Sequence, residues 1–86
     1  MNWVFMGSSN MKMSAFIGKE CAIITPRRKD DGHRVLYACN PKDREKWYFY
    51  TSTIVSVTRE ELFEDGYAVL TVRTHNSEYK FWKKCD

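Results

Sequence analysis

The sequence feature that most constrains the fold is an unbroken run of twelve β-forming residues at 47–58, W-Y-F-Y-T-S-T-I-V-S-V-T. Aromatic and β-branched side chains favour strands. The second half alternates polar and apolar residues, so Val55 and Val57 are expected to face the core. Because twelve residues exceed the usual strand length, a bend or bulge is expected near Thr51 and Ser52.

Turn-forming residues divide the rest of the chain into shorter segments. Gly, Pro, Asn and Asp recur roughly every eight to twelve residues, which is typical of short strands joined by turns. The pattern predicts further strands at 2–6, 21–25, 34–38, 67–74 and 78–84. It predicts polar loops at 26–33 and 40–46, a strand or one helical turn at 11–17, and a loop or one helical turn at 59–66. A turn is expected at 75–77, in which Asn76 takes a positive φ.

These segments predict a mainly β fold. Five or six strands in so small a chain favour a strongly bent antiparallel sheet or an SH3-like or OB-like barrel. The 86 residues form a single domain, 1–86, with a small core. Since Met1, Met6, Met11 and Met13 are alternative starts, residues 1–10 are expected to be a flexible or misassigned N-terminal extension, with the core beginning near Met13.

The cysteines favour a reducing compartment. Cys21, Cys39 and Cys85 are odd in number and widely spaced, whereas small secreted domains carry paired cysteines. No apolar run exceeds five residues, so no membrane span is expected, and the N-terminal segment lacks the charged start of a signal peptide. The predicted localisation is therefore cytoplasmic.

The residue types needed for catalysis or metal binding are too scattered to form a site. The best nucleophile–base pair, Cys39 and His33, flanks a predicted five-residue strand that would separate the two by about 17 to 20 Å. Zinc sites need ligands in close pairs, and here every Cys and His is isolated. The sequence therefore predicts a non-enzymatic protein without metal or cofactor.

Basic side chains gather in two predicted loops of a chain whose net charge is +3. Cations bind phosphates and flat rings stack on bases, so such loops beside aromatic strands favour binding to RNA or single-stranded nucleic acid. This interpretation requires both loops to lie at the same end of the sheet. The candidate phosphate-binding residues are Arg27, Arg28, Lys29, Lys42, Arg44 and Lys46, and the candidate stacking residues are Tyr48 and Trp82.

The second half of the chain resembles small bacteriophage and prophage accessory proteins. The shared pattern is a T-S-x-I/V-V strand, here T-S-T-I-V at 51–55, followed by a T-x-N-S-x-Y turn, here T-H-N-S-E-Y at 74–79. The resemblance covers about residues 47–81. It implies a phage source, a β fold and an accessory role such as countering a host defence system, and it transfers no catalytic residue.

A second interpretation is open at this point. The acidic segment 60–65 is similar in charge to a nucleic acid, so the chain is also suited to be a stoichiometric inhibitor that binds a host defence or regulatory protein. Exposed strand edges and surface aromatics are further compatible with a homodimer.

Overall fold

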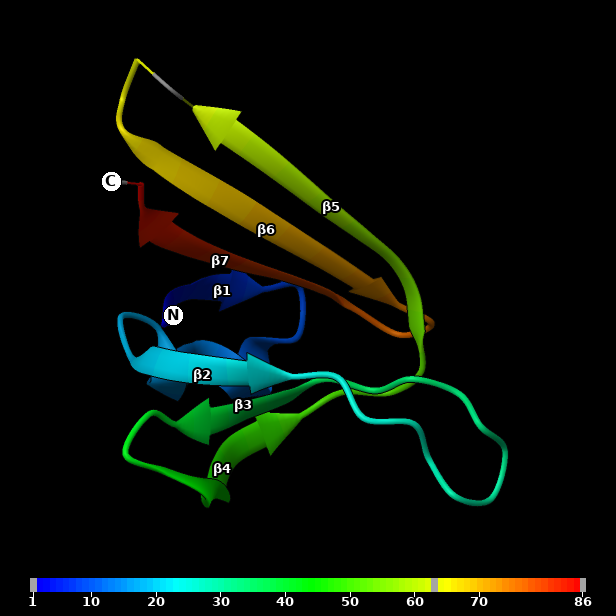
Figure 1. Ribbon diagram of the computed structural model, residues 1–86. Coiled ribbons are helices and arrows are strands. Elements are labelled where there is room, and N and C mark those ends of the chain that lie inside the picture. The colour runs from blue at the N-terminus through cyan, green and yellow to red at the C-terminus, as the bar shows by residue number, and fades with distance from the viewer. Residues whose placement is uncertain (1, 63, 86) are drawn as a thin grey trace.

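The computed structural model describes residues 2–62 and 64–85, which form one antiparallel sheet (Figure 1). The strands follow the order β4-β3-β2-β1-β7-β6-β5 across the sheet. Their bounds are β1 (Trp3–Ser8), β2 (Glu20–Ile24), β3 (Tyr37–Asn40), β4 (Asp43–Tyr50), β5 (Ile54–Leu62), β6 (Tyr67–Thr74) and β7 (Glu78–Lys84), and a short 3-10 helix, η1 (Met11–Phe16), lies between β1 and β2.

The order of the strands forces the sheet to bend. β4 and β5 are its two edges, yet only residues 51–53 join them along the chain. In a flat sheet the edges would be about 29 Å apart, whereas the connection from Tyr50 to Ile54 spans at most about 14 Å. The two edges therefore meet at one end, and Figure 1 shows the two halves of the sheet diverging from there.

Backbone hydrogen bonds join the β4–β5 connection and the start of β5 to the segment that precedes β3. Thr51 N donates to Leu36 O at 2.9 Å, and Ile54 N donates to Arg34 O at 2.8 Å. β4 and β5 are not paired with each other, so the sheet is not closed. The mainly β prediction and the strong bend are confirmed, but the barrel of five to six strands is wrong, because seven strands form one open sheet.

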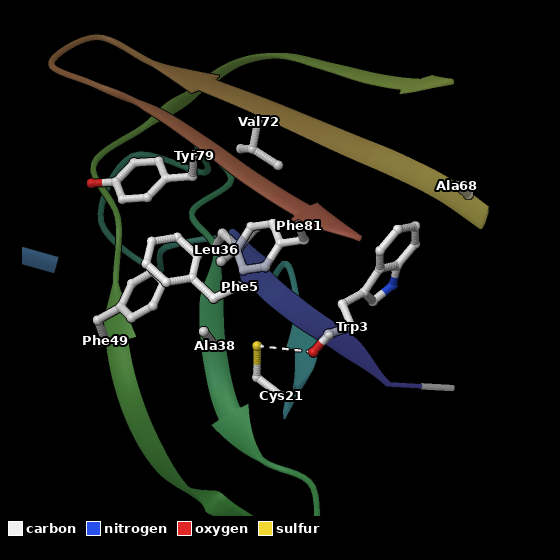
Figure 2. Close-up of a cluster of buried hydrophobic side chains, with 10 residues drawn as sticks. All are labelled: Trp3, Phe5, Cys21, Leu36, Ala38, Phe49, Ala68, Val72, Tyr79 and Phe81. Carbon is white, nitrogen blue, oxygen red and sulfur yellow. Dashed lines mark hydrogen bonds between the residues drawn. The ribbon is translucent and has the colours of Figure 1, made fainter. Parts of the chain in front are cut away.

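The core fills the concave side of the bend (Figure 2). Phe5 lies between Phe49 and Phe81, with ring centroids 4.9 and 5.4 Å away, and Phe49 stacks on Tyr79 at 5.8 Å. These rings come from β1, β4 and β7, so they connect the two halves of the sheet. The buried cluster consists of Trp3, Phe5, Cys21, Leu36, Ala38, Phe49, Ala68, Val72, Tyr79 and Phe81.

The N-terminal segment belongs to the centre of the sheet. β1 pairs with β2 on one side and with β7 on the other, and its Trp3 and Phe5 are buried. This differs from the expectation that residues 1–10 form an extension and that the core begins near Met13. The strand predicted at 2–6 is short and is followed by Gly7 and two serines. Its sequence pattern therefore does not show that other strands pair with both of its edges.

The long β-forming run is divided at the expected place. β4 ends at Tyr50 and β5 begins at Ile54, so the break falls at 51–53. The inward placement of Val55 and Val57 is wrong, since these side chains are 56 % and 53 % exposed. β5 is an edge strand in the half that diverges from β4. It runs on to Leu62, so the loop or helical turn predicted from residue 59 is wrong at 59–62.

Smaller differences concern the other connections. The predicted loop at 40–46 is only a turn at Pro41 and Lys42, because β4 already begins at Asp43. Of the predicted strand at 34–38, only Tyr37 and Ala38 belong to β3, while Arg34 forms an isolated bridge with Arg27. Of the described residues only glycines have a positive φ, so Asn76 does not.

The segment 11–17 follows the helical alternative, as η1. Asn10 caps this helix by accepting a hydrogen bond from Lys12 N at 3.1 Å. Within residues 2–62 and 64–85, no helix has the length and apolar character required to cross a membrane.

Candidate nucleic-acid interface

The two basic loops lie at opposite ends of the sheet. The chain enters β3 from the loop at 25–36 and leaves it through the turn at Pro41 and Lys42, and consecutive turns of an antiparallel meander lie at opposite ends. Figure 1 shows the long loop on one side of the molecule and the β3–β4 turn on the other. The expected common rim of positive charge is therefore not formed.

Two cations of the loop at 25–36 already have partners in the protein. Arg27 Nη1 donates to Gly32 O at 3.0 Å, and Arg28 pairs with Asp31 at 3.1 Å and donates to the Thr53 hydroxyl. The pKa of Asp31 is lowered, mainly by the hydrogen bond that it accepts from the backbone N–H of His33. These contacts give Arg27 and Arg28 a structural role, whereas Lys29 is exposed in the same loop.

Trp82 lies far from the other candidate residues. It belongs to β7, where it meets Tyr67 edge to face at 6.3 Å and lines a shallow pocket of about 350 Å³ with Tyr67 and Met6. β7 packs against β4 across the core through Tyr79 and Phe81, whereas Trp82 alternates with these residues and lies on the opposite, outer face of β7. Trp82 therefore cannot stack on the same nucleotide as Tyr48.

The remaining four candidate residues are brought together on the edge strand. Arg44, Lys46 and Tyr48 belong to β4, and Lys42 immediately precedes it. Lys19 joins them from the start of the β2 region, since its ammonium lies 5.3 Å from the centre of the Tyr48 ring. A groove of about 560 Å³ runs beside this pair and is lined by Asn2, Lys19, Glu20, Asn40, Pro41, Lys42 and Tyr48.

Three further aromatic rings form a cluster that the sequence did not predict. Tyr37 and Tyr50 stack with their centroids 5.5 Å apart, and Trp47 meets their edges at 5.9 and 5.1 Å. Trp47 is 50 % exposed and Tyr50 is 54 % exposed, although both belong to the largest apolar side chains. An exposed cluster of this kind marks a binding surface more often than a packing role.

A bulge in β4 explains why Trp47 and Tyr50 lie on the same face although strict alternation along the strand would place them on opposite faces. Tyr37 pairs with Tyr50 and Ala38 with Phe49, but the register then shifts so that Cys39 pairs with Trp47. Without the shift, Trp47 would share a face with Phe49, which is buried in the core. The shift instead sends Trp47 to the outer face beside Tyr50.

A second groove extends this surface along the edge. It has a volume of about 430 Å³, and it lies between η1 and β4, with Lys12, Met13, Phe16, Trp47, Tyr48, Phe49 and Tyr50 lining it. Rings and cations thus border β4 along its free edge. We name this region the β4 edge surface, and define it as Lys12, Lys19, Tyr37, Lys42, Arg44, Lys46, Trp47, Tyr48 and Tyr50.

The acidic segment lies at the opposite edge of the sheet. Glu60 and Glu61 extend β5, and Glu61 pairs with Arg59 at 2.9 Å. Glu64 and Asp65 are exposed in the following turn. This arrangement separates the carboxylates from the β4 edge surface, whose own acidic neighbours are Glu20, Asp43 and Glu45.

The groups considered for catalysis are placed apart from one another. Cys39 is buried beneath the Trp47 side of the sheet, and burial raises the pKa of its thiol. His33 lies in the exposed loop at the other end of β3. In the part of the chain that the structure describes, no three His, Cys, Asp or Glu side chains converge to hold a metal ion.

Comparison with known proteins gives no relative for this chain. No protein-family model, no curated protein and no solved structure matches it.

Proposed function

We propose that the protein binds single-stranded nucleic acid, with RNA as the first candidate, along the β4 edge surface. The observation that carries this proposal is the cluster of Tyr37, Trp47 and Tyr50, of which Trp47 and Tyr50 are exposed, beside the cations on and just before β4. The two recognition elements for a single strand are thus present within one short segment.

Each element has a defined role in the proposal. Lys42, Arg44 and Lys46 are exposed and bind phosphates, so affinity is expected to fall as salt rises. Trp47 and Tyr50 provide an accessible stack for bases, each worth about 1–3 kcal/mol. Tyr48 offers a second ring on the groove side, next to Lys19.

The surface favours a single strand over a duplex. Bases in a duplex are already stacked on one another, and their faces are not available to protein side chains. The free rings of Trp47 and Tyr50 can therefore contribute only where bases are unpaired. A strand that follows β4 would meet both grooves that border it.

Residues 47–81 resemble phage accessory proteins, which supports the proposal that a phage uses this RNA binding. A protein that occupies an RNA without cleaving it acts by stoichiometry, which suits the countering of a host defence system. This part of the proposal depends on the resemblance alone.

The experiment that tests the proposal is a binding titration with a labelled, unstructured oligoribonucleotide at several salt concentrations. Two variants with equal charge change are compared, Lys42→Glu/Arg44→Glu/Lys46→Glu and Lys29→Glu/Lys80→Glu/Lys84→Glu, whose three cations are exposed and lie outside the β4 edge surface. The first is expected to lose binding and to flatten the salt dependence, and the second to retain most of the affinity.

Two outcomes would contradict the proposal. Equal losses in both variants would show that binding follows net charge and not the β4 edge surface. Absence of binding in the wild type, together with recovery of one host protein from nuclease-treated lysate, would favour the inhibitor interpretation.

A further inference from the structure

The free edge of β5 is a second surface with a recognisable partner. Within β5 every residue from Val55 to Glu61 is exposed. Its pairing with β6 is regular from Ser56 to Leu62, so one side of a straight ladder faces outward without a strand beside it. Such an edge is a template for another strand.

The other edge of the sheet is protected from this kind of pairing. β4 carries two register shifts against β3, between Ala38 and Cys39 and between Cys39 and Asn40. Bulges and edge lysines are devices that prevent strands from pairing at an edge, and Lys46 lies in the bulged stretch. β5 has neither a lysine nor a proline, and its only shift is at Val55.

We propose that β5 pairs with β5 of a second copy of this chain, antiparallel and with Thr58 on the two-fold axis. A symmetric antiparallel pair places one residue opposite itself. Centring on Thr58 sets Ser56 opposite Glu60 and Val57 opposite Arg59 of the other copy. The stem of Arg59 then covers Val57, which is 53 % exposed in the single chain.

The charges of β5 select this register over its neighbours. A symmetric pair centred on Arg59 would place two guanidinium groups opposite each other, and one centred on Glu60 would do the same with two carboxylates. Like charges directly opposite destabilise a strand pair, whereas threonines opposite each other favour it. A symmetric pair centred on Val57 would have a shorter stretch of regular pairing, because the bulge at Val55 would interrupt it.

The consequence is a continuous sheet through both copies. Each copy contributes β5 at the middle, so the pairing uses the β5 edges and leaves the β4 edges without a strand from the other copy. A strand pair of this length buries less area than a standard stable interface, so the dimer is expected to form reversibly with rising concentration. The inference does not depend on nucleic-acid binding.

Sedimentation velocity tests the dimer. The average mass of the wild-type protein is expected to rise toward twice that of the chain between about 10 and 500 µM. Val57→Lys places a cation opposite Arg59 and is expected to remain a monomer over this range. Ile17→Lys is the matched control, since Ile17 is 54 % exposed and lies outside β5, and it is expected to dimerise like the wild type.

Cysteine cross-linking tests the register. In a Cys85→Ser background, Thr58→Cys is expected to form an intermolecular disulfide on mild oxidation, because residues on the axis lie within disulfide distance. Ser56→Cys, which faces Glu60 of the partner, is expected to cross-link much less. A wild-type protein that stays monomeric at the highest concentration, or equal cross-linking in both variants, would overturn the proposal.

Discussion

Leu36 and Thr51 are joined by two hydrogen bonds in opposite directions. Thr51 N donates to Leu36 O at 2.9 Å, and Leu36 N donates to the Thr51 hydroxyl at 3.1 Å. Both residues are buried. Thr51 lies in the connection between the two edge strands, so this pair stabilises the end at which the two edges of the bent sheet meet.

Replacing Thr51 with valine should weaken the fold. The variant keeps the size of the side chain but removes the hydroxyl that accepts the hydrogen bond of Leu36 N, and an unsatisfied buried N–H costs about 1–3 kcal/mol. Urea unfolding followed by tryptophan fluorescence measures the loss. Thr51→Ser keeps the hydroxyl and should lose clearly less, so equal stability of Thr51→Val and the wild type would contradict this role.

Removal of residues 1–10 should abolish folding. The deletion takes away β1, which pairs on both sides, together with the buried rings of Trp3 and Phe5. Circular dichroism and nuclear magnetic resonance of the shortened chain would report the result. A shortened chain that unfolds cooperatively, at the wild-type midpoint, would contradict the central placement of β1.

A single substitution within β1 gives a graded version of the same test. Phe5→Ala removes a ring that contacts Phe49 and Phe81, and such losses typically cost about 3–5 kcal/mol. Met6→Ala, at the exposed neighbouring position, should cost less than about 0.5 kcal/mol. The difference between the two unfolding free energies is the quantity to measure, and similar values would contradict the packing described for Phe5.

Cys21 should make the protein sensitive to alkaline pH. Burial, followed by Cys39 and Glu20, raises the pKa of its thiol from 9.0 to about 11, and the protonated sulfur donates to Trp3 O at 3.4 Å. Because the unfolded chain ionises this thiol more readily, its contribution to stability is complete below pH 9 and is lost as pH rises through about 11. Urea midpoints at several pH values should therefore fall more steeply in the wild type than in Cys21→Ala.

Alkylation gives an independent readout of the same property. At about pH 8 the Cys21 thiol should react with iodoacetamide far more slowly in the native protein than Cys85, which is only partly buried. Mass spectrometry of peptides after a short exposure locates the modification. Equal labelling of Cys21 and Cys85 would contradict the buried, protonated state of Cys21.

Local features of the fold follow from the sequence to a large extent. The alternation at 67–74 and 78–84 predicts β6 and β7 closely, because β7 alternates between buried and exposed residues and β6 has one face that is more buried than the other. The break near Thr51 also follows, since twelve β-forming residues cannot form one strand in so small a domain. These are properties of short segments, and the alternation of apolar and polar residues along a segment predicts them directly.

The arrangement of the strands does not follow in the same way. Val55 and Val57 alternate like core residues, and only the position of β5 at a diverging edge leaves them exposed. The candidate site depends equally on tertiary structure. The meander separates Arg27 from Lys42, and a register shift in β4 turns Trp47 toward Tyr50, so neither relationship is visible in the spacing of residues.

The most direct test of nucleic-acid binding at the β4 edge surface is the dissociation constant of one labelled single-stranded oligoribonucleotide, measured side by side for Trp47→Ala and Trp82→Ala. Both variants lose an exposed indole, but only Trp47 belongs to the proposed surface. Trp47→Ala should bind about 5- to 150-fold more weakly than the wild type, which corresponds to about 1–3 kcal/mol, and Trp82→Ala should bind as the wild type does. Unchanged affinity in Trp47→Ala, or an equal loss in both variants, would contradict the proposal.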